Sequence, residues 1–269
     1  MVEMLRLPFI QMALLASLIA SQLAAYLGVY ILLKRIIFVG IALAQIATLG
    51  VAFGQFFGLH PTACALAFSL GGAAFFATPL SWRSLPRESM IGVAYAAASA
   101  FAILLVAKNP LGEMDVLALI FGNILGVTTT QVLILAAVAT AVFAIHGFFY
   151  KEFLFTAFDP ETAETMGYRV WGWELLFSLL LGAAFAVTVG AAGVLVIFAY
   201  LVIPATTALL LNLRLPATLL VAMAMSATGS FIGVYLSYVW DLPTGPSIVA
   251  VLTCGLLAVW AIKRLAFSS

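Results

Sequence analysis

Successive apolar runs of about 20 residues are the feature of this sequence that most limits its fold. A hydrocarbon core about 30 Å thick needs roughly 20 apolar residues per crossing helix, and an isolated segment there must satisfy its backbone hydrogen bonds internally. Charged and turn residues divide the chain into nine such runs, at 8–33, 36–58, 61–80, 90–107, 129–149, 172–190, 192–212, 217–240 and 246–263. The sequence predicts an all-α, polytopic membrane protein of one domain, 1–269, with about nine transmembrane helices, or eight if 171–212 is divided differently.

The composition supports the same class. Apolar residues make up 65% of the 269 residues and charged residues 8%, whereas soluble domains are about half apolar and a quarter charged. Eleven Lys and Arg against ten Asp and Glu give a net charge of +1, so the basic excess that nucleic-acid phosphates require is missing. Cys64 and Cys254 are too far apart in the chain for a metal-ligand motif. The expected surroundings are a lipid bilayer, and no nucleic acid is expected to bind.

Basic residues orient the predicted helices. With the amino terminus outside, Arg6 and Lys108 are external, and the cytoplasmic set is Lys34, Arg35, Arg83, Arg87, Lys151, Arg169, Arg214, Lys263 and Arg264. Cytoplasmic loops carry the excess of Lys and Arg, which favours this orientation. Residues 116–127 are apolar but too short to cross, and two crossings there would oppose the charge distribution. We expect a short re-entrant or interfacial helix on the outer side.

The ionisable residues argue against a self-powered carrier or an enzyme. Asp, Glu, Lys and Arg are absent at the predicted midplane, where ion-coupled carriers place their relays; Glu174 lies near a cytoplasmic helix end. The phosphate-loop pattern GxxxxGK[ST] is also absent. His60 and His146 lie near opposite faces of the membrane, and His146 is expected to reach the interface. We expect no catalytic residues, no cofactor, and either a partner that supplies the energy or a passive channel.

Polar residues follow one face of the second predicted helix. Gln45, Thr48 and Gln55 recur there at helical spacing. They either hydrogen-bond a neighbouring helix or line a translocation path, because unpaired polar groups in hydrocarbon are costly. A second cluster, Asn123 with 128–131, lies on the outer side. It forms either the mouth of a vestibule or a helix start with Thr caps.

Two cytoplasmic segments have distinctive patterns, and the second is a candidate for docking another subunit. In 151–170, Asp159 precedes Pro160 and Glu161, a pattern typical of a helix start. In 203–216, Pro204 and Pro216 bracket a short apolar segment that contains Arg214. This second segment predicts either a docking helix at the membrane face or an ordinary helix end and turn.

Several stretches together resemble a known family. They are GVYILLKRIIFVGIALAQIATLGVAFG, LIFGNILGV, FDPETAETMG, AAGVLVIFAYLVIPA and DLPTGPSIV. In order and spacing the chain resembles the permease subunits of bacterial ABC importers for zinc, manganese and iron. It is more remotely similar to the permeases of vitamin B12 and siderophore importers.

The resemblance implies a type II importer in the bacterial cytoplasmic membrane. Two permease copies would surround a central path, two cytoplasmic ATPase subunits would drive it, and an external solute-binding protein would deliver the substrate. It also implies that 203–216, with Pro204, Arg214 and Pro216, couples to the ATPase. Asp159 and Glu161 would lie in an adjoining cytoplasmic loop.

One departure from the family bears on the substrate. The metal-importing relatives have GD-x-x-x-H in the second helix, and Ile41 and Gln45 occupy the Asp and His positions here. An Ile side chain cannot bind a metal, and an amide binds transition metals far more weakly than imidazole does. A divalent metal ion remains the leading substrate, with a metal chelate or a small organic solute as alternatives. The expected path residues are Ile41, Gln45, Thr48, Gln55 and Asn123. Outside the class of importers, the sequence is also compatible with a passive channel or with an assembly subunit that has no transport activity.

Overall fold

The computed structural model describes residues 8–78, 86–108 and 124–266. Eleven α-helices and one short 3-10 helix make up this part of the chain, which contains no strand. Arg6, Arg83, Asn123 and most of the segment expected to be re-entrant, 116–123, lie outside the described residues. The remainder of that segment contains the 3-10 helix η2, Ile124–Gly126, which begins at the buried side chain of Ile124.

The helices follow the apolar runs closely. The first six are α1 (Pro8–Leu33), α2 (Ile37–Phe57), α3 (Pro61–Ala77), α4 (Arg87–Ala107), α6 (Thr129–Phe148) and α7 (Tyr150–Phe158). The others are α8 (Pro160–Thr165), α9 (Val170–Ala192), α10 (Val194–Leu210), α11 (Leu215–Trp240) and α12 (Thr244–Ala266). Apart from α7 and α8, each helix agrees with a predicted span to within three residues at both ends.

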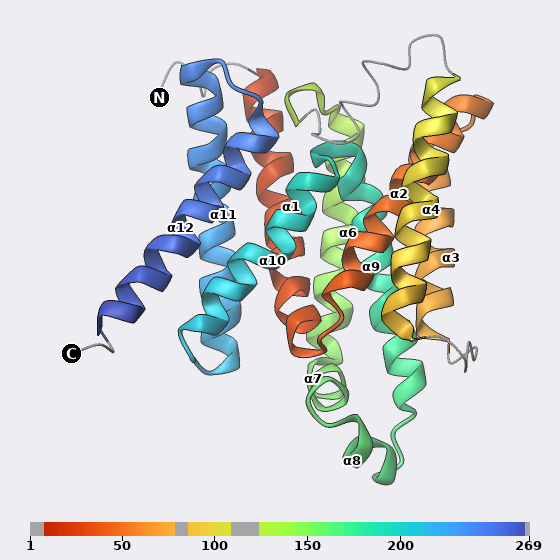
Figure 1. Ribbon diagram of the computed structural model, residues 1–269, viewed down its shortest axis with the longest axis vertical. Coiled ribbons are helices and arrows are strands. Elements are labelled where there is room, and N and C mark those ends of the chain that lie inside the picture. Colours follow the sequence, from red (N-terminus) through yellow and green to blue (C-terminus); the bar gives the residue numbers. More distant parts are fainter. Residues whose placement is uncertain (1–7, 79–85, 109–123, 267–269) are drawn as a thin grey trace.

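Seven helices are long and apolar enough to cross a membrane: α1, α2, α4, α6, α9, α11 and α12. The apolar helices α3 and α10 have 17 residues each. At 1.5 Å per residue they are about 26 Å long, near the lower limit for crossing hydrocarbon. α3 runs between the same two ends of the bundle as the longer helices, whereas α10 reaches the lower end but begins below the upper ends of α1 and α11 (Figure 1).

A single glycine separates α9 from α10. Gly193 has φ 79° and ψ 159°, a combination that is essentially restricted to glycine. The chain reverses direction there, as Figure 1 shows at the upper ends of these helices. The predicted division of 171–212 into two helices is therefore what the structure shows.

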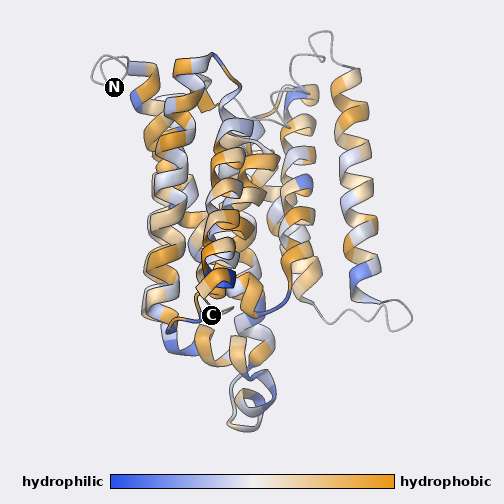
Figure 2. Cartoon of the chain, turned by 60° about the vertical axis from the view of Figure 1, so that its left-hand side comes forward, coloured by the Kyte–Doolittle hydropathy of each residue, from blue (hydrophilic) through white to orange (hydrophobic). Residues whose placement is uncertain are grey.

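Packing places α1 in the middle of one group of helices and α2 in another. α1 packs against α10 and α11, α2 packs against α3 and α4, and α12 packs against α10 and α11. Gly50 and Gly54 face α3 so closely that an added Cβ would lie 2.7 Å from the Cα of Ala65 and 2.8 Å from that of Pro61. The small residues thus allow the backbones to approach. Hydrophobic residues follow the length of the long helices, and hydrophilic ones gather mostly near their ends (Figure 2).

Candidate translocation path and docking segments

The polar face of α2 is only partly accessible. Ile41 and Gln45 are half-buried, Thr48 is buried, and Gln55 is exposed in the last turn of the helix. The Thr48 hydroxyl donates to the carbonyl oxygen of Ala44, 2.9 Å away in the same helix. Thr48 therefore satisfies its donor locally, without a neighbouring helix.

Gln45 differs from Thr48 in this respect. Within the described part of the chain its side-chain amide makes no hydrogen bond, and it sits half-buried near the middle of α2. Across residues 8–78, 86–108 and 124–266, no three His, Cys, Asp or Glu side chains gather as metal ligands. An ion on this face would meet neutral amide and hydroxyl groups, which hold divalent cations weakly.

The outer polar cluster is largely a helix start. The Thr128 hydroxyl accepts from the backbone N–H of Gln131 at 3.3 Å, and the Gln131 side chain accepts from the backbone N–H of Thr128 at 2.9 Å. This is a capping box at the beginning of α6. The interpretation of these residues as Thr caps is confirmed, while Asn123 lies outside the described residues.

α7 and α8 form an arm, residues 150–165, that lies beyond the ends of most of the other helices, beside the first turns of α9 (Figure 1). The predicted helix start is confirmed, because Asp159 Oδ1 accepts from the Thr162 N–H at 3.0 Å and Pro160 is the first helical residue. Hydrogen bonds from the side chain and the backbone of Thr162 hold the pKa of the Asp159 carboxyl below its usual range. Glu161 is exposed in the first turn of α8.

Large apolar side chains are exposed on and beside this arm. Phe158 is 60% exposed and Met166, just after α8, is 69% exposed. Exposed apolar groups of this kind are typical of a surface that contacts another protein or a membrane.

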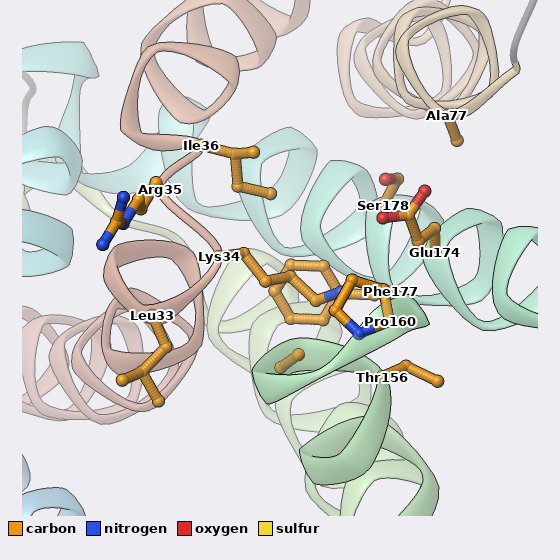
Figure 3. Close-up of a pocket in the computed structure, with 11 residues that line it drawn as sticks. Leu33, Lys34, Arg35, Ile36, Ala77, Thr156, Pro160, Glu174, Phe177 and Ser178 are labelled. Atoms are coloured by element: carbon orange, nitrogen blue, oxygen red, sulfur yellow. The ribbon is translucent and has the colours of Figure 1, made fainter. Parts of the chain in front are cut away.

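A pocket of about 130 Å³ separates the arm from the turn between α1 and α2. Lys34 lies over the ring of Phe177, 5.5 Å from its centroid, and Glu174 and Ser178 lie together on α9 (Figure 3). Arg35 also lines the pocket but points away from Phe177. Side chains of both charges line this space, which is therefore not a site for ions of one sign.

Residues 203–216 do not form a separate helix. They comprise the end of α10, a turn in which Asn212 has φ 53°, and the start of α11 with Pro216 in its first turn. Arg214 and Pro216 are exposed, whereas Pro204 is buried inside α10. Pro204 therefore cannot itself touch a docked subunit, because neighbouring helices surround it.

His146 does not reach the interface as the sequence predicted. It is 0% exposed, in the last turn of α6. Aromatic side chains from α1, α7 and α9 surround its ring. That prediction was wrong because α7 lies at the end of α6, where Phe153 stacks on the imidazole ring. His60 is exposed immediately before α3, as expected for an interfacial residue.

The sequence profile of the ABC 3 transport family matches residues 6–263. The chain belongs to the ABC 3 transport family. Among its relatives, the manganese transport system membrane protein MntC of Listeria innocua is 29% identical, over 91% of this chain and 87% of that protein. The chelated iron transport system membrane protein YfeC of Yersinia pestis is 31% identical, over 94% of this chain and 87% of that protein.

A solved structure agrees with this assignment to the ABC 3 transport family. PsaBC from Streptococcus pneumoniae, in complex with Fab, contains a chain that superposes with a TM-score of 0.87 at 27% identity. The match covers 96% of this chain and 94% of that one. The chain is therefore a multi-pass permease subunit of an ABC transporter in the cytoplasmic membrane.

Proposed function

We propose that the chain imports a divalent metal ion of the zinc, manganese or iron class, as one permease copy of two around a central path. The observation that carries the proposal is the family match over residues 6–263. Relatives named for manganese and for chelated iron support a metal cargo. In this proposal, two copies of a separate cytoplasmic subunit hydrolyse ATP, and an external solute-binding protein delivers the ion.

The proposed path includes Ile41, Gln45, Thr48 and Gln55 of α2, with Asn123 at the outer mouth. The half-buried Gln45 amide supports this assignment, because its oxygen has no protein partner within the described residues. A neutral amide would let an ion pass without holding it tightly. A metal chelate or a small organic solute is the alternative cargo, since the Asp and His of the metal-importing relatives are Ile41 and Gln45 here.

We further propose nine crossings, made by the seven long helices together with α3 and α10. The alternating direction of these helices and the reversal at Gly193 support this count. The two short helices are long enough if the surrounding protein or a locally thinner bilayer accommodates them. The termini would then lie on opposite sides, with the carboxyl terminus in the cytoplasm.

For the ATPase we propose two contact segments, with the arm as the principal one. The arm (within 151–170, with Asp159 and Glu161) projects furthest and exposes Phe158, and the exposed Met166 follows it directly. The turn between α10 and α11 (within 203–216, with Arg214 and Pro216) lies at the same end of the bundle. Movement of a docked ATPase dimer could then alternate the path between outward-open and inward-open arrangements.

Reconstitution tests the function. Liposomes that contain this chain with its ATPase and its binding protein should accumulate Mn²⁺ against a gradient when ATP is supplied on the cytoplasmic side. Accumulation of a siderophore-bound metal but not of Mn²⁺ would establish the chelate as the cargo. If the chain alone in liposomes dissipates a Mn²⁺ gradient without ATP, it is a channel and the proposal fails.

A further inference from the structure

His146 lies where the bundle meets the arm. It is in the last turn of α6, two residues before that helix ends at Phe148, and α7 begins at Tyr150. The ring is completely buried. We call this connection between the end of α6 and the start of α7, with His146 at its centre, the joint.

The imidazole contacts every element that meets at the joint. It stacks on Phe153 of α7, with centroids 4.0 Å apart and an interplanar angle of 7°. Tyr26 and Tyr30 of α1 approach it edge-on, at 5.3 and 4.6 Å. Phe177 of α9 also meets it edge-on, at 5.9 Å. Such aromatic pairs have preferred geometries and therefore resist sliding.

A hydrogen bond adds direction to this packing. The Tyr26 hydroxyl lies 3.2 Å from Nδ1 of His146. Tyr26 also belongs to the stretch of α1 that packs against α10 and α11. One turn earlier, Gln22 donates to the carbonyl oxygen of Met223 in α11 at 3.0 Å. Two residues later, Gly28 packs directly on the backbone of α10.

Apolar packing alone does not account for a histidine at this position. Within the described part of the chain, Nε2 of His146 and the hydroxyl of Tyr30 are buried without a hydrogen-bond partner. Burying an unpaired polar group is unfavourable, and a phenylalanine would fill the same space without that penalty. The Tyr26 hydrogen bond is what the histidine provides and a phenylalanine would not.

We propose that His146 is a positioning residue that fixes the arm to α1 through Phe153 and Tyr26, so that movement of the docked ATPase reaches the translocation helices. This inference rests on the proposed function, in which the arm contacts the ATPase. Through α1, the joint connects the arm with α10 and α11. If these contacts were weakened, the ATPase could complete its cycle of hydrolysis without opening the translocation path.

Tyr26→Phe tests this with the smallest change, since it removes one hydroxyl and keeps the ring. The matched control is Tyr200→Phe, which removes the buried hydroxyl that accepts from Ser230 Oγ at 2.7 Å, between α10 and α11. The measurement is the number of ATP molecules hydrolysed per Mn²⁺ imported, in liposomes that contain the complete transporter. Tyr26→Phe should raise this ratio about threefold, the factor that a typical hydrogen bond inside a membrane protein represents.

The remaining outcomes separate the two proposals. Tyr200→Phe should leave the ratio within measurement error. Adding Tyr26→Phe to His146→Phe should change nothing further, because the two residues share one interaction. An unchanged ratio in Tyr26→Phe, or an equal rise in Tyr200→Phe, overturns the role of His146 while wild-type import still supports the proposed function. A wild-type transporter that imports none of Mn²⁺, Zn²⁺ and Fe²⁺ refutes the proposed function, and this inference with it.

Discussion

Gly28 of α1 and Leu201 of α10 are in direct backbone contact: a Cβ added at Gly28 would lie only 1.9 Å from the carbonyl oxygen of Leu201. No side chain can fit in that gap. The contact brings α1 against the helix that leads to the turn of the second docking segment. Close backbone approach of this kind is how helices associate where lipid removes the hydrophobic driving force.

Gly28→Ala should destabilise the protein, by about 1–3 kcal/mol as for other overpacked sites. Either α1 or α10 must shift, because the obstacle is backbone rather than a flexible side chain. Denaturant unfolding of the purified protein in detergent measures the change. Gly71→Ala in α3 is the control, since nothing lies within 4 Å of its added Cβ. There the helix should become slightly more stable, by up to about 1 kcal/mol, and equal losses at both positions would contradict the packing argument.

Ile41→Asp combined with Gln45→His should increase the amount of metal retained by the purified transporter. The pair restores, one turn apart on α2, the carboxylate and imidazole that suit transition metals. Retention is measured as Mn²⁺ per transporter after gel filtration. Gln55→His serves as the control, because it adds one imidazole at an exposed position without a second new ligand. If the double variant retains no more metal than this control, α2 does not carry a metal path at that depth.

Met166→Glu should weaken co-purification of the ATPase more than Leu213→Glu does. Both side chains are exposed, at 69% and 44%, but only Met166 follows the projecting arm. A carboxylate buried in an apolar contact would be left unpaired. A stronger effect of Leu213→Glu, or of Arg214→Glu, would make the turn between α10 and α11 the principal contact instead.

Acid should loosen the start of α8. The pKa of Asp159 is lowered in the folded arm, so its ionised cap stabilises the arm above the ordinary Asp pKa of about 3.9. That contribution disappears as the pH falls through the lower folded value. Hydrogen exchange of residues 161–165, corrected for the intrinsic effect of pH, should accelerate below that range in the wild type.

Asp159→Ala should show the faster exchange already at neutral pH, because the acceptor for the Thr162 N–H is gone. Asp159→Asn should exchange slowly at both pH values, since its neutral side chain still caps the helix. Acid-accelerated exchange in Asp159→Asn equal to that of the wild type would show that another group responds to the pH.

Much of the fold could be predicted from local features of the sequence. The run from 217 to 240 became α11, Leu215–Trp240, because the length of an apolar run is matched to the bilayer wherever its neighbours lie. Asp159 before Pro160 predicted the start of α8, because a helix cap also depends only on residues close in sequence. For the candidate path, the spacing of polar residues identified one face of α2. It could not show which of those side chains already have hydrogen-bond partners.

Tertiary structure decided what depends on distant residues. Thr48 satisfies its hydroxyl within α2, whereas the half-buried Gln45 amide has no partner in the described residues. His146 looked like a helix-end residue bound for water, yet Phe153, Tyr26 and Phe177 enclose it. Hydropathy is a property of each segment and fixed the crossing helices. Burial and hydrogen bonding are properties of pairs far apart in the chain, so only the packed bundle could determine the joint at His146 and the arm beyond it.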